Sequence, residues 1–129
     1  MIVVDCTVVV DALTGVDGTD DLRQLLAAEQ LASPSLLDYE VVSVLRSLTL
    51  RRVLTAPRAL DVMTDLEDLP IRRWPSSDGL RRRSYQLRDN VSAYDAAYVV
   101  LAEVLECSLL TRDLKLARTG GHGVPIHVL

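Results

Sequence analysis

Four acidic residues occupy positions where a carboxylate is unusual: Asp5, Glu40, Asp95 and Asp113. Asp5 ends the apolar run at residues 1–4, and Asp113 follows the apolar stretch at residues 107–111. A short apolar run rich in β-branched residues, without polar alternation, predicts a strand buried on both faces. In open α/β sheets, ligands bind beyond the carboxyl ends of the strands. We therefore expect Asp5 and Asp113 at a ligand-binding edge.

The other two acidic residues lie on predicted helices. One helix is expected from about Leu36 to Arg52, and Glu40 sits on the shoulder of its apolar stripe rather than on the opposite face. Another helix follows Ser92 and is apolar on every face after Asp95, which predicts that it is largely buried. Asp95 projects along the same apolar side as its neighbours one turn away.

Helix capping offers a simpler explanation for two of these carboxylates. Asp is a favoured N-cap residue, so Asp5 taken alone is equally well explained as the cap of a short helix that begins near Thr7. Ser92 and Asp95 have the spacing of a capping box. Capping does not explain why Asp95 points along the apolar side, so the choice depends on where the four acidic residues lie together.

Alternation of strands and helices predicts an α/β fold, with one domain over residues 1–129 and a central parallel β-sheet flanked by helices. The short helix near Thr7 is expected to end at Gly15, and Ser35 with Asp38 has the spacing of a capping box. The other expected elements are strands at 31–33, 71–74 and 124–129 and helices at 20–30, 57–69, 79–88 and from 114 onward.

This topology brings the four carboxylates to one edge of the sheet, because crossover connections carry helix starts to the carboxyl ends of the strands. Four converging carboxylates repel one another unless a cation lies between them. Oxygen ligands without a His or Cys favour Mg²⁺, with Mn²⁺ possible. Such ions are typical of phosphoryl-transfer sites. The pattern therefore predicts metal-assisted hydrolysis of a phosphodiester.

Composition restricts the class of protein. The chain has 129 residues, of which 49% are hydrophobic and 25% charged, as in an ordinary globular domain. No apolar stretch is long enough to cross a bilayer and the start lacks the basic residues of a signal peptide, so we expect a cytoplasmic protein. Cys6 and Cys107 are expected to be buried free thiols. The net charge of −4 does not suit a general nucleic-acid coat.

The positive charge is nevertheless clustered. Lys115 is the only lysine, and arginines occur in runs at 51–52, 72–73 and 81–83. The planar guanidinium suits phosphates better than the lysine ammonium does. We expect arginines at the rim of the site, where they would contact a nucleic-acid backbone.

With these residues in view, the sequence resembles the PIN-domain ribonucleases, and specifically the VapC-type toxins of bacterial toxin–antitoxin pairs. The matching stretches are Val3–Asp5 with Val8–Asp11, Ser33–Pro34 leading to Glu40–Val41, Tyr94–Tyr98 with Leu101–Glu103, and Leu110–Asp113. They span nearly the whole chain in the order typical of the family.

The resemblance implies that the four carboxylates bind the catalytic metal and that Thr111 hydrogen-bonds near them. It also implies an RNA substrate, a homodimer and inhibition by a VapB-type antitoxin. Asp11 and Glu103 match family positions too, but we expect them to be structural. Tyr94 and Tyr98 could stack on a base, although core packing is the favoured role.

Three other functions are weighed against this one. A receiver domain needs a lysine after a late strand, and Lys115 falls inside the next helix instead. A phosphatase with an Asp-x-Asp motif is not supported, because Thr7 replaces the second Asp. The remaining alternative is a catalytically silent PIN fold that sequesters an antitoxin or RNA, which a Mg²⁺-dependent nuclease assay would distinguish.

Overall fold

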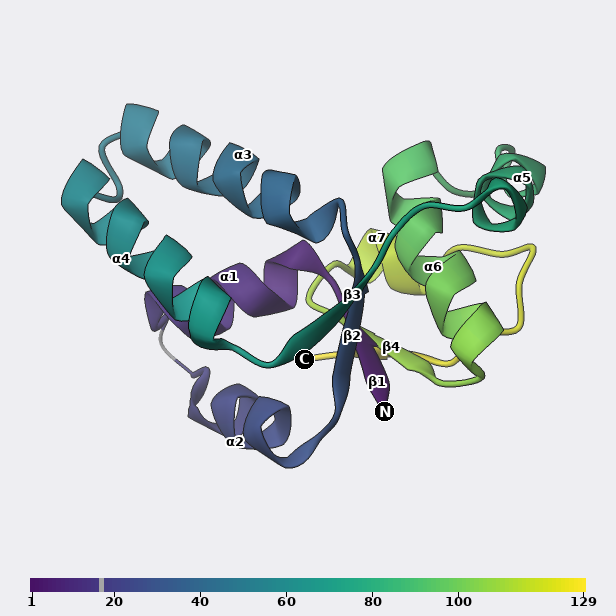
Figure 1. Cartoon of the computed structure of the whole chain (residues 1–129), viewed down its shortest axis with the longest axis horizontal. Coiled ribbons are helices and arrows are strands. Elements are labelled where there is room, and N and C mark those ends of the chain that lie inside the picture. Colours follow the sequence, from purple (N-terminus) through teal and green to yellow (C-terminus); the bar gives the residue numbers. More distant parts are fainter. Residues whose placement is uncertain (17) are drawn as a thin grey trace.

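The computed structural model describes residues 1–16 and 18–129, and its elements form a sheet with helices on both faces (Figure 1). The elements in chain order are β1 (Ile2–Val4), α1 (Cys6–Thr14), α2 (Asp20–Ala28), β2 (Leu31–Pro34), α3 (Leu37–Leu50), α4 (Ala56–Asp68), β3 (Ile71–Trp74), α5 (Asp78–Gln86), α6 (Ala93–Leu105), β4 (Ser108–Thr111), α7 (Leu114–Ala117) and β5 (Ile126–Val128). The strand order is β3-β2-β1-β4-β5, and every neighbouring pair is parallel. The expected central parallel sheet is confirmed.

The central strand β1 is buried on both faces, as its unbroken apolar run predicts. Val3 and Val4 are both fully buried, but they belong to different hydrophobic clusters on opposite sides of the sheet. Leu109 and Leu110 on β4 alternate in the same way. This alternation is the period of two of a β-strand, and it places one core under α1 to α4 and another under α5 to α7.

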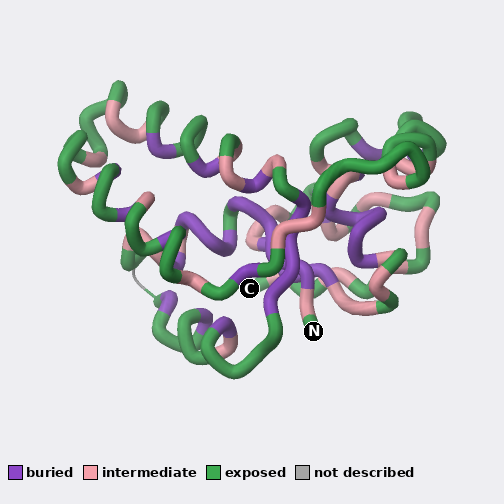
Figure 2. The backbone as a smooth tube through the Cα atoms, viewed as in Figure 1, coloured by how far each residue is buried: buried purple, intermediate pink, exposed green. Residues whose placement is uncertain are grey.

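Figure 2 shows the buried segments running through the sheet and α1, while the outer turns of α3, α4 and α5 are exposed. Local residues fix the helix ends. Asp5 caps α1, and Gly15 ends it with a φ of 72°, a left-handed conformation that glycine adopts easily. Pro57 lies in the first turn of α4, where its missing N–H costs nothing.

The capping box predicted for Ser35 and Asp38 is wrong. The N-cap of α3 is Leu36, and no side chain caps it. The Asp38 carboxylate instead accepts hydrogen bonds from Arg73, from Nε at 3.2 Å and from the terminal nitrogen at 3.1 Å. A long-range ion pair between α3 and β3 therefore replaces a local contact that the spacing favoured.

The two cysteines are free, with Cys6 buried and Cys107 only half-buried. In the described part of the chain, no helix has the length and apolar character needed to span a bilayer.

The packing of α3 onto the core can be tested with two leucines of that helix. Leu45 is completely buried, so Leu45→Ala should lower the free energy of unfolding by about 2–5 kcal/mol. Leu50 is 65% exposed, so Leu50→Ala should change it by less than about 0.5 kcal/mol. Urea denaturation measures both values. Equal losses would contradict the orientation of α3.

Candidate active site

The four acidic residues line one cavity of about 500 Å³ at the carboxyl edge of the sheet. Asp5 directly follows β1, and Asp113 lies two residues beyond the end of β4. Glu40 and Asp95 lie in the first turns of α3 and α6. β1 and β4 are neighbouring strands whose connections leave on opposite faces, which is where α/β sheets open a ligand-binding crevice. The predicted convergence at this cavity is therefore found.

Asp5 is the most buried of the four, with only 5% of its surface exposed. Its Oδ1 accepts hydrogen bonds from the Thr7 hydroxyl at 2.6 Å and from the Val8 N–H at 3.2 Å. Its Oδ2 accepts one from the Thr111 hydroxyl at 2.5 Å. Burial raises the pKa of Asp5, and these hydrogen bonds oppose the rise by stabilising the charged form. Asp5 is thus both the helix cap and a cavity residue, so the two explanations are not exclusive.

Glu40 is fixed by a residue far away in sequence. The hydroxyl of Tyr98 on α6 donates a hydrogen bond to Glu40 Oε1 at 2.6 Å. Burial raises the pKa of Glu40, and repulsion from Asp95 and Asp5 raises it further, while the bond from Tyr98 lowers it. The carboxylates therefore interact electrostatically across the cavity.

Asp95 and Asp113 are half-buried and less constrained. Asp113 caps the short helix α7 by accepting a hydrogen bond from the Lys115 N–H at 2.9 Å. The capping box proposed for Ser92 and Asp95 is not formed, because Ser92 makes no side-chain capping bond. Within the described residues, no hydrogen bond reaches the Asp95 carboxylate, which leaves its oxygens available to a ligand.

Comparison with known proteins adds an independent observation. Residues 2–122 match the model of the PIN domain. The chain belongs to the PIN-domain family. It is 44% identical to the VapC ribonuclease Mb0985 of Mycobacterium bovis over all of this chain and 98% of that protein.

Two solved structures share the PIN fold. VapBC2 from Rickettsia felis, bound to a DNA fragment from its promoter, matches with a TM-score of 0.70 and 14% identity over 99% of this chain and 98% of that one. A toxin–antitoxin complex from Klebsiella pneumoniae matches with a TM-score of 0.67 and 20% identity over 96% and 95%.

Oxygen donors border the cavity of this PIN domain, and they suit a hard divalent cation. An ionised carboxylate has about four lone-pair positions, and Asp5 uses three of them. As the side chains stand, however, no three His, Cys, Asp or Glu groups among residues 1–16 and 18–129 are close enough to hold one ion together. The donor chemistry fits a metal, and holding one ion with three of these groups would require at least one side chain to move.

The thiol of Cys6 also lines the cavity, and burial and the negative charge around it raise its pKa. Burial raises its pKa to about 12, with further contributions from Glu40, Asp5 and Asp11. A thiol with this pKa stays protonated at neutral pH, so Cys6 is not a nucleophile here.

Asp11 and Glu103 are structural, as expected. Asp11 pairs with Arg112 at 2.7 Å, and Glu103 pairs with Arg83 at 2.7 Å, which joins α6 to α5. The prediction that both tyrosines pack in the core is confirmed for Tyr98, which is 2% exposed, and is wrong for Tyr94, which is 71% exposed.

Two contacts of the PIN domain were missed from sequence: the bond from Thr7 to Asp5 and the bond from Tyr98 to Glu40. Thr7 lies two residues after Asp5, a spacing at which a carboxylate and a hydroxyl meet in a turn. Tyr98 lies three residues after Asp95, on the same face of its helix. These two spacings are the features of the sequence from which the two hydrogen bonds could be predicted.

Relief of repulsion should appear in the stability of the metal-free protein. Glu40→Gln keeps an oxygen that can accept the hydrogen bond from the Tyr98 hydroxyl, and Asp95→Asn disturbs no hydrogen bond of the described residues. The free energy of unfolding of both variants should therefore equal or exceed that of the wild type. The gain is bounded by the repulsion of ~4 kcal/mol between charges ~4 Å apart at a dielectric of ~20. Asp61→Asn, on the exposed face of α4, is the matched control and should change nothing. Chemical denaturation in a chelator measures all three.

The raised pKa of Glu40 also predicts how the stability of the metal-free protein changes with pH. Because the pKa of folded Glu40 is raised above its ordinary 4.5, the folded state keeps a proton that the unfolded chain releases. Stability of the metal-free wild type should therefore fall as pH rises from about this value, and Glu40→Gln should flatten the fall. A Gln variant with the wild-type slope would contradict the charge interaction.

Proposed function

We propose that this PIN domain is a metal-dependent endoribonuclease, the toxin of a toxin–antitoxin pair, that hydrolyses RNA phosphodiester bonds in the cavity lined by four carboxylates. The observation that carries the proposal is the arrival of Asp5, Glu40, Asp95 and Asp113 at one cavity from four separate elements. The ribonuclease name of a full-length relative at 44% identity supports the same activity. We expect it to act in the cytoplasm.

The four carboxylates, each at the start of a different helix, would hold Mg²⁺ or Mn²⁺. A divalent ion held there would supply a water of lowered pKa and would stabilise charge on the oxygens of the phosphate. Asp5 is positioned for this by the two threonine hydroxyls, and Glu40 by Tyr98. Groups fixed in this way need little reorganisation when charge develops in the transition state.

Asp5, Glu40, Asp95 and Asp113 are all present in the cavity, which favours an active nuclease over a silent binding module. Repulsion from Asp95 and Asp5 raises the pKa of Glu40, which is an energetic cost that a module serving only to sequester a partner would not need to bear. A binding function does not require them, whereas phosphodiester hydrolysis does.

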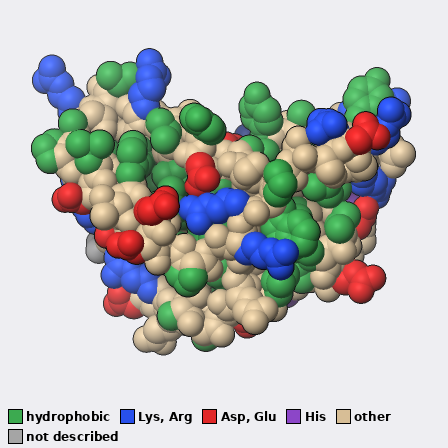
Figure 3. Space-filling view, in the orientation of Figure 1, with side chains coloured by type: hydrophobic (Ala, Val, Ile, Leu, Met, Phe, Trp, Pro, Cys, Tyr) green, Lys and Arg blue, Asp and Glu red, His purple; other side chains and the backbone are tan. Residues whose placement is uncertain are grey.

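A partner helix needs a groove between two adjacent helices, and α2 and α3, at residues 20–50, are not such a pair in the described part of the chain. α2 packs against α1, whereas α3 packs against α1 and α4, so the adjacent helices are α3 and α4. Hydrophobic side chains gather over this pair on the face shown in Figure 3, and Leu50, Val53 and Leu60 are each more than half exposed. We place the VapB-type antitoxin there. The homodimer that the family resemblance implies remains part of the proposal.

Metal dependence is the first test. The wild type should cleave RNA with Mg²⁺ or Mn²⁺ and lose the activity in excess chelator, because no histidine is among the described residues that line the cavity. Asp95→Asn should reduce cleavage by more than about 100-fold, since even outer partners of metal ligands are worth 10–100-fold. Asp61→Asn should cleave like the wild type. Cleavage that persists in chelator would rule out the metal mechanism.

Thermal unfolding with and without Mg²⁺ separates a metal ligand from a residue that only shapes the cavity. Mg²⁺ should raise the melting temperature of the wild type and of Asp61→Asn, because binding stabilises only the folded state. The rise should be smaller for Asp95→Asn. An active Asp95→Asn protein with an unchanged Mg²⁺ response would refute the assignment of that ligand.

The partner is tested in cells. Expression of the chain alone should arrest growth, and co-expression with a VapB-type antitoxin should relieve the arrest. Leu60→Asp on α4 should weaken that relief, because it places a charge in the proposed apolar interface. Asp61→Asn is again the neighbouring control. Normal growth when the intact chain is expressed alone would argue against the toxin assignment.

A further inference from the structure

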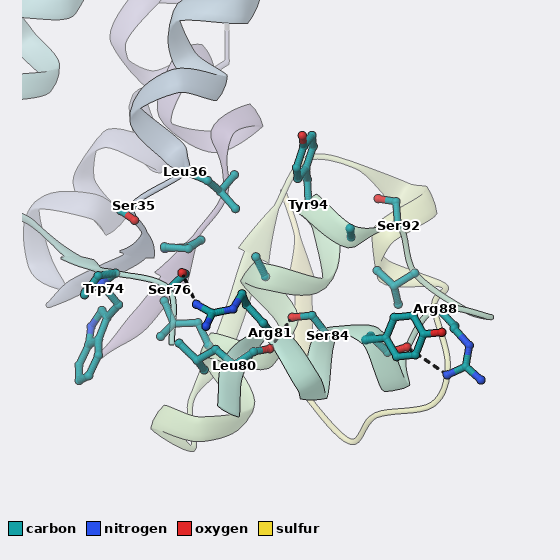
Figure 4. A pocket seen from close by; sticks show the side chains of 17 residues that line it. Ser35, Leu36, Trp74, Ser76, Leu80, Arg81, Ser84, Arg88, Ser92 and Tyr94 are labelled. Atoms are coloured by element: carbon teal, nitrogen blue, oxygen red, sulfur yellow. Dashed lines mark hydrogen bonds between the residues drawn. The ribbon is translucent and has the colours of Figure 1, made fainter. Parts of the chain in front are cut away.

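A second cavity, of about 510 Å³, adjoins the carboxylate cavity. It lies between α5, the start of α6 and the segments that follow β2 and β3 (Figure 4). Leu36 and Tyr94 line both cavities, so the two are neighbours along one surface. We refer to the second cavity as the arginine groove. Its volume is in the range of ordinary ligand sites.

The charges of the two cavities are opposite. Among the described residues that line the arginine groove there are two arginines, Arg81 and Arg88, and no acid. Those that line the carboxylate cavity include four acids and no arginine or lysine. A phosphate backbone would be repelled by the metal-free carboxylates and attracted by the groove beside them.

Arg81 and Arg88 keep their charge available. In the described part of the chain neither forms an ion pair; Arg81 donates to the Ser76 hydroxyl at 2.8 Å, and Arg88 lies over the Tyr85 ring at 4.6 Å. Figure 4 shows Arg81 and Arg88 at separate points along the groove. They could therefore contact different phosphates of one strand.

Neighbouring arginines are neutralised instead. Arg82 pairs with Asp78 at 2.9 Å on the exposed side of α5, and Arg83 pairs with Glu103 at 2.7 Å. The run of three arginines at 81–83 thus divides by function: one faces the groove, one is at the surface and one joins two helices. Within this run, Arg81 is the arginine without an ion pair among the described residues, and it is also the one that lines the groove, which favours an anionic ligand there.

The rest of the lining suits an unpaired base. Leu80, Val91 and Leu101 contribute an apolar surface, and Tyr94 presents a ring that is 71% exposed at the boundary with the carboxylate cavity. Aromatic rings of this kind stack on bases without regard to sequence. The hydroxyl of Ser92, which caps nothing, lies at the groove and could bond a base edge.

We propose that the arginine groove binds a single-stranded segment of the RNA next to the bond to be cut, with a base against Tyr94 and the apolar lining and with phosphates against Arg81 and Arg88. This inference rests on the proposed function, because it names the part of the substrate that leads into the carboxylate cavity. A single strand is required since a base within a duplex cannot be reached by such a surface.

Binding without cleavage gives the direct test. The full chain carrying Asp95→Asn is mixed, in chelator, with a short fluorescein-labelled single-stranded RNA of mixed sequence, and anisotropy is followed over a series of NaCl concentrations. Adding Arg81→Gln should weaken binding at every salt concentration and make the slope of log K against log [NaCl] shallower by about 0.7, the value for one phosphate contact on a single strand. Adding Tyr94→Ala should weaken binding about tenfold, as for the loss of one stacked base, without changing the slope.

Arg82→Gln is the matched control, because it removes the same charge from the next residue of α5 but does not line the groove; its affinity and slope should equal those of the parent. Both side chains are exposed, and melting temperatures confirm that each variant folds. If Arg81→Gln and Tyr94→Ala bind like Arg82→Gln, the groove does not hold RNA and the inference is overturned.

Two further outcomes are distinguishable. If Arg81→Gln or Tyr94→Ala changes the sedimentation coefficient of the protein and leaves RNA affinity intact, the groove joins two copies of the chain and the inference is again wrong. If the binding results are as expected but the wild type cuts no RNA with Mg²⁺ or Mn²⁺, the groove stands and the nuclease proposal fails.

Discussion

The buried carboxylate of Asp5 is the constraint on which the site depends. Removing an ionised group from water is costly unless other groups replace its hydration. Here three donors do so: the hydroxyls of Thr7 and Thr111 and the Val8 N–H. The hydroxyls in turn accept bonds from the Arg112 and Asp113 N–H groups, each at 3.0 Å. One network therefore joins β1, the start of α1, the end of β4 and the turn that carries Asp113.

This network holds Asp5 with more hydrogen bonds than Glu40 or Asp95 receives among the described residues. Linked hydrogen bonds polarise one another, so Asp5 and the backbone of Asp113 are fixed relative to each other. Glu40 has a single partner in Tyr98, and Asp95 has none among the described residues. A cation entering the cavity would find Asp5 in place and would draw the freer carboxylates toward itself, which accords with a ligand set that is not gathered in advance.

Sequence reasoning succeeded where a single periodicity decides the outcome. The uninterrupted apolar run of β1 predicts burial on both faces, and the parallel sheet then brings strand ends and helix starts to one edge, which is enough to gather the four acids.

Sequence reasoning failed where the partner of a side chain lies far along the chain. Asp38 prefers Arg73, 35 residues away, to a local cap, and Glu40 is bound by Tyr98, 58 residues away. α3 lies against α4 instead of α2 because chain reversal at residues 51–55 packs the two apolar faces together. Local spacing contains no information on such pairs.

The separation of charge between two adjoining cavities suits the proposed polyanionic substrate. Carboxylates that bind a cation must repel phosphate when the cation is absent. Arginines placed among them would form ion pairs, as Arg112 does with Asp11, and would compete with the metal for the carboxylate oxygens. Setting Arg81 and Arg88 beyond Leu36 and Tyr94 avoids that competition. In the proposed arrangement, affinity for RNA and affinity for the metal would reside in different side chains, so a change at Arg81 would alter how tightly RNA is held without altering the carboxylates.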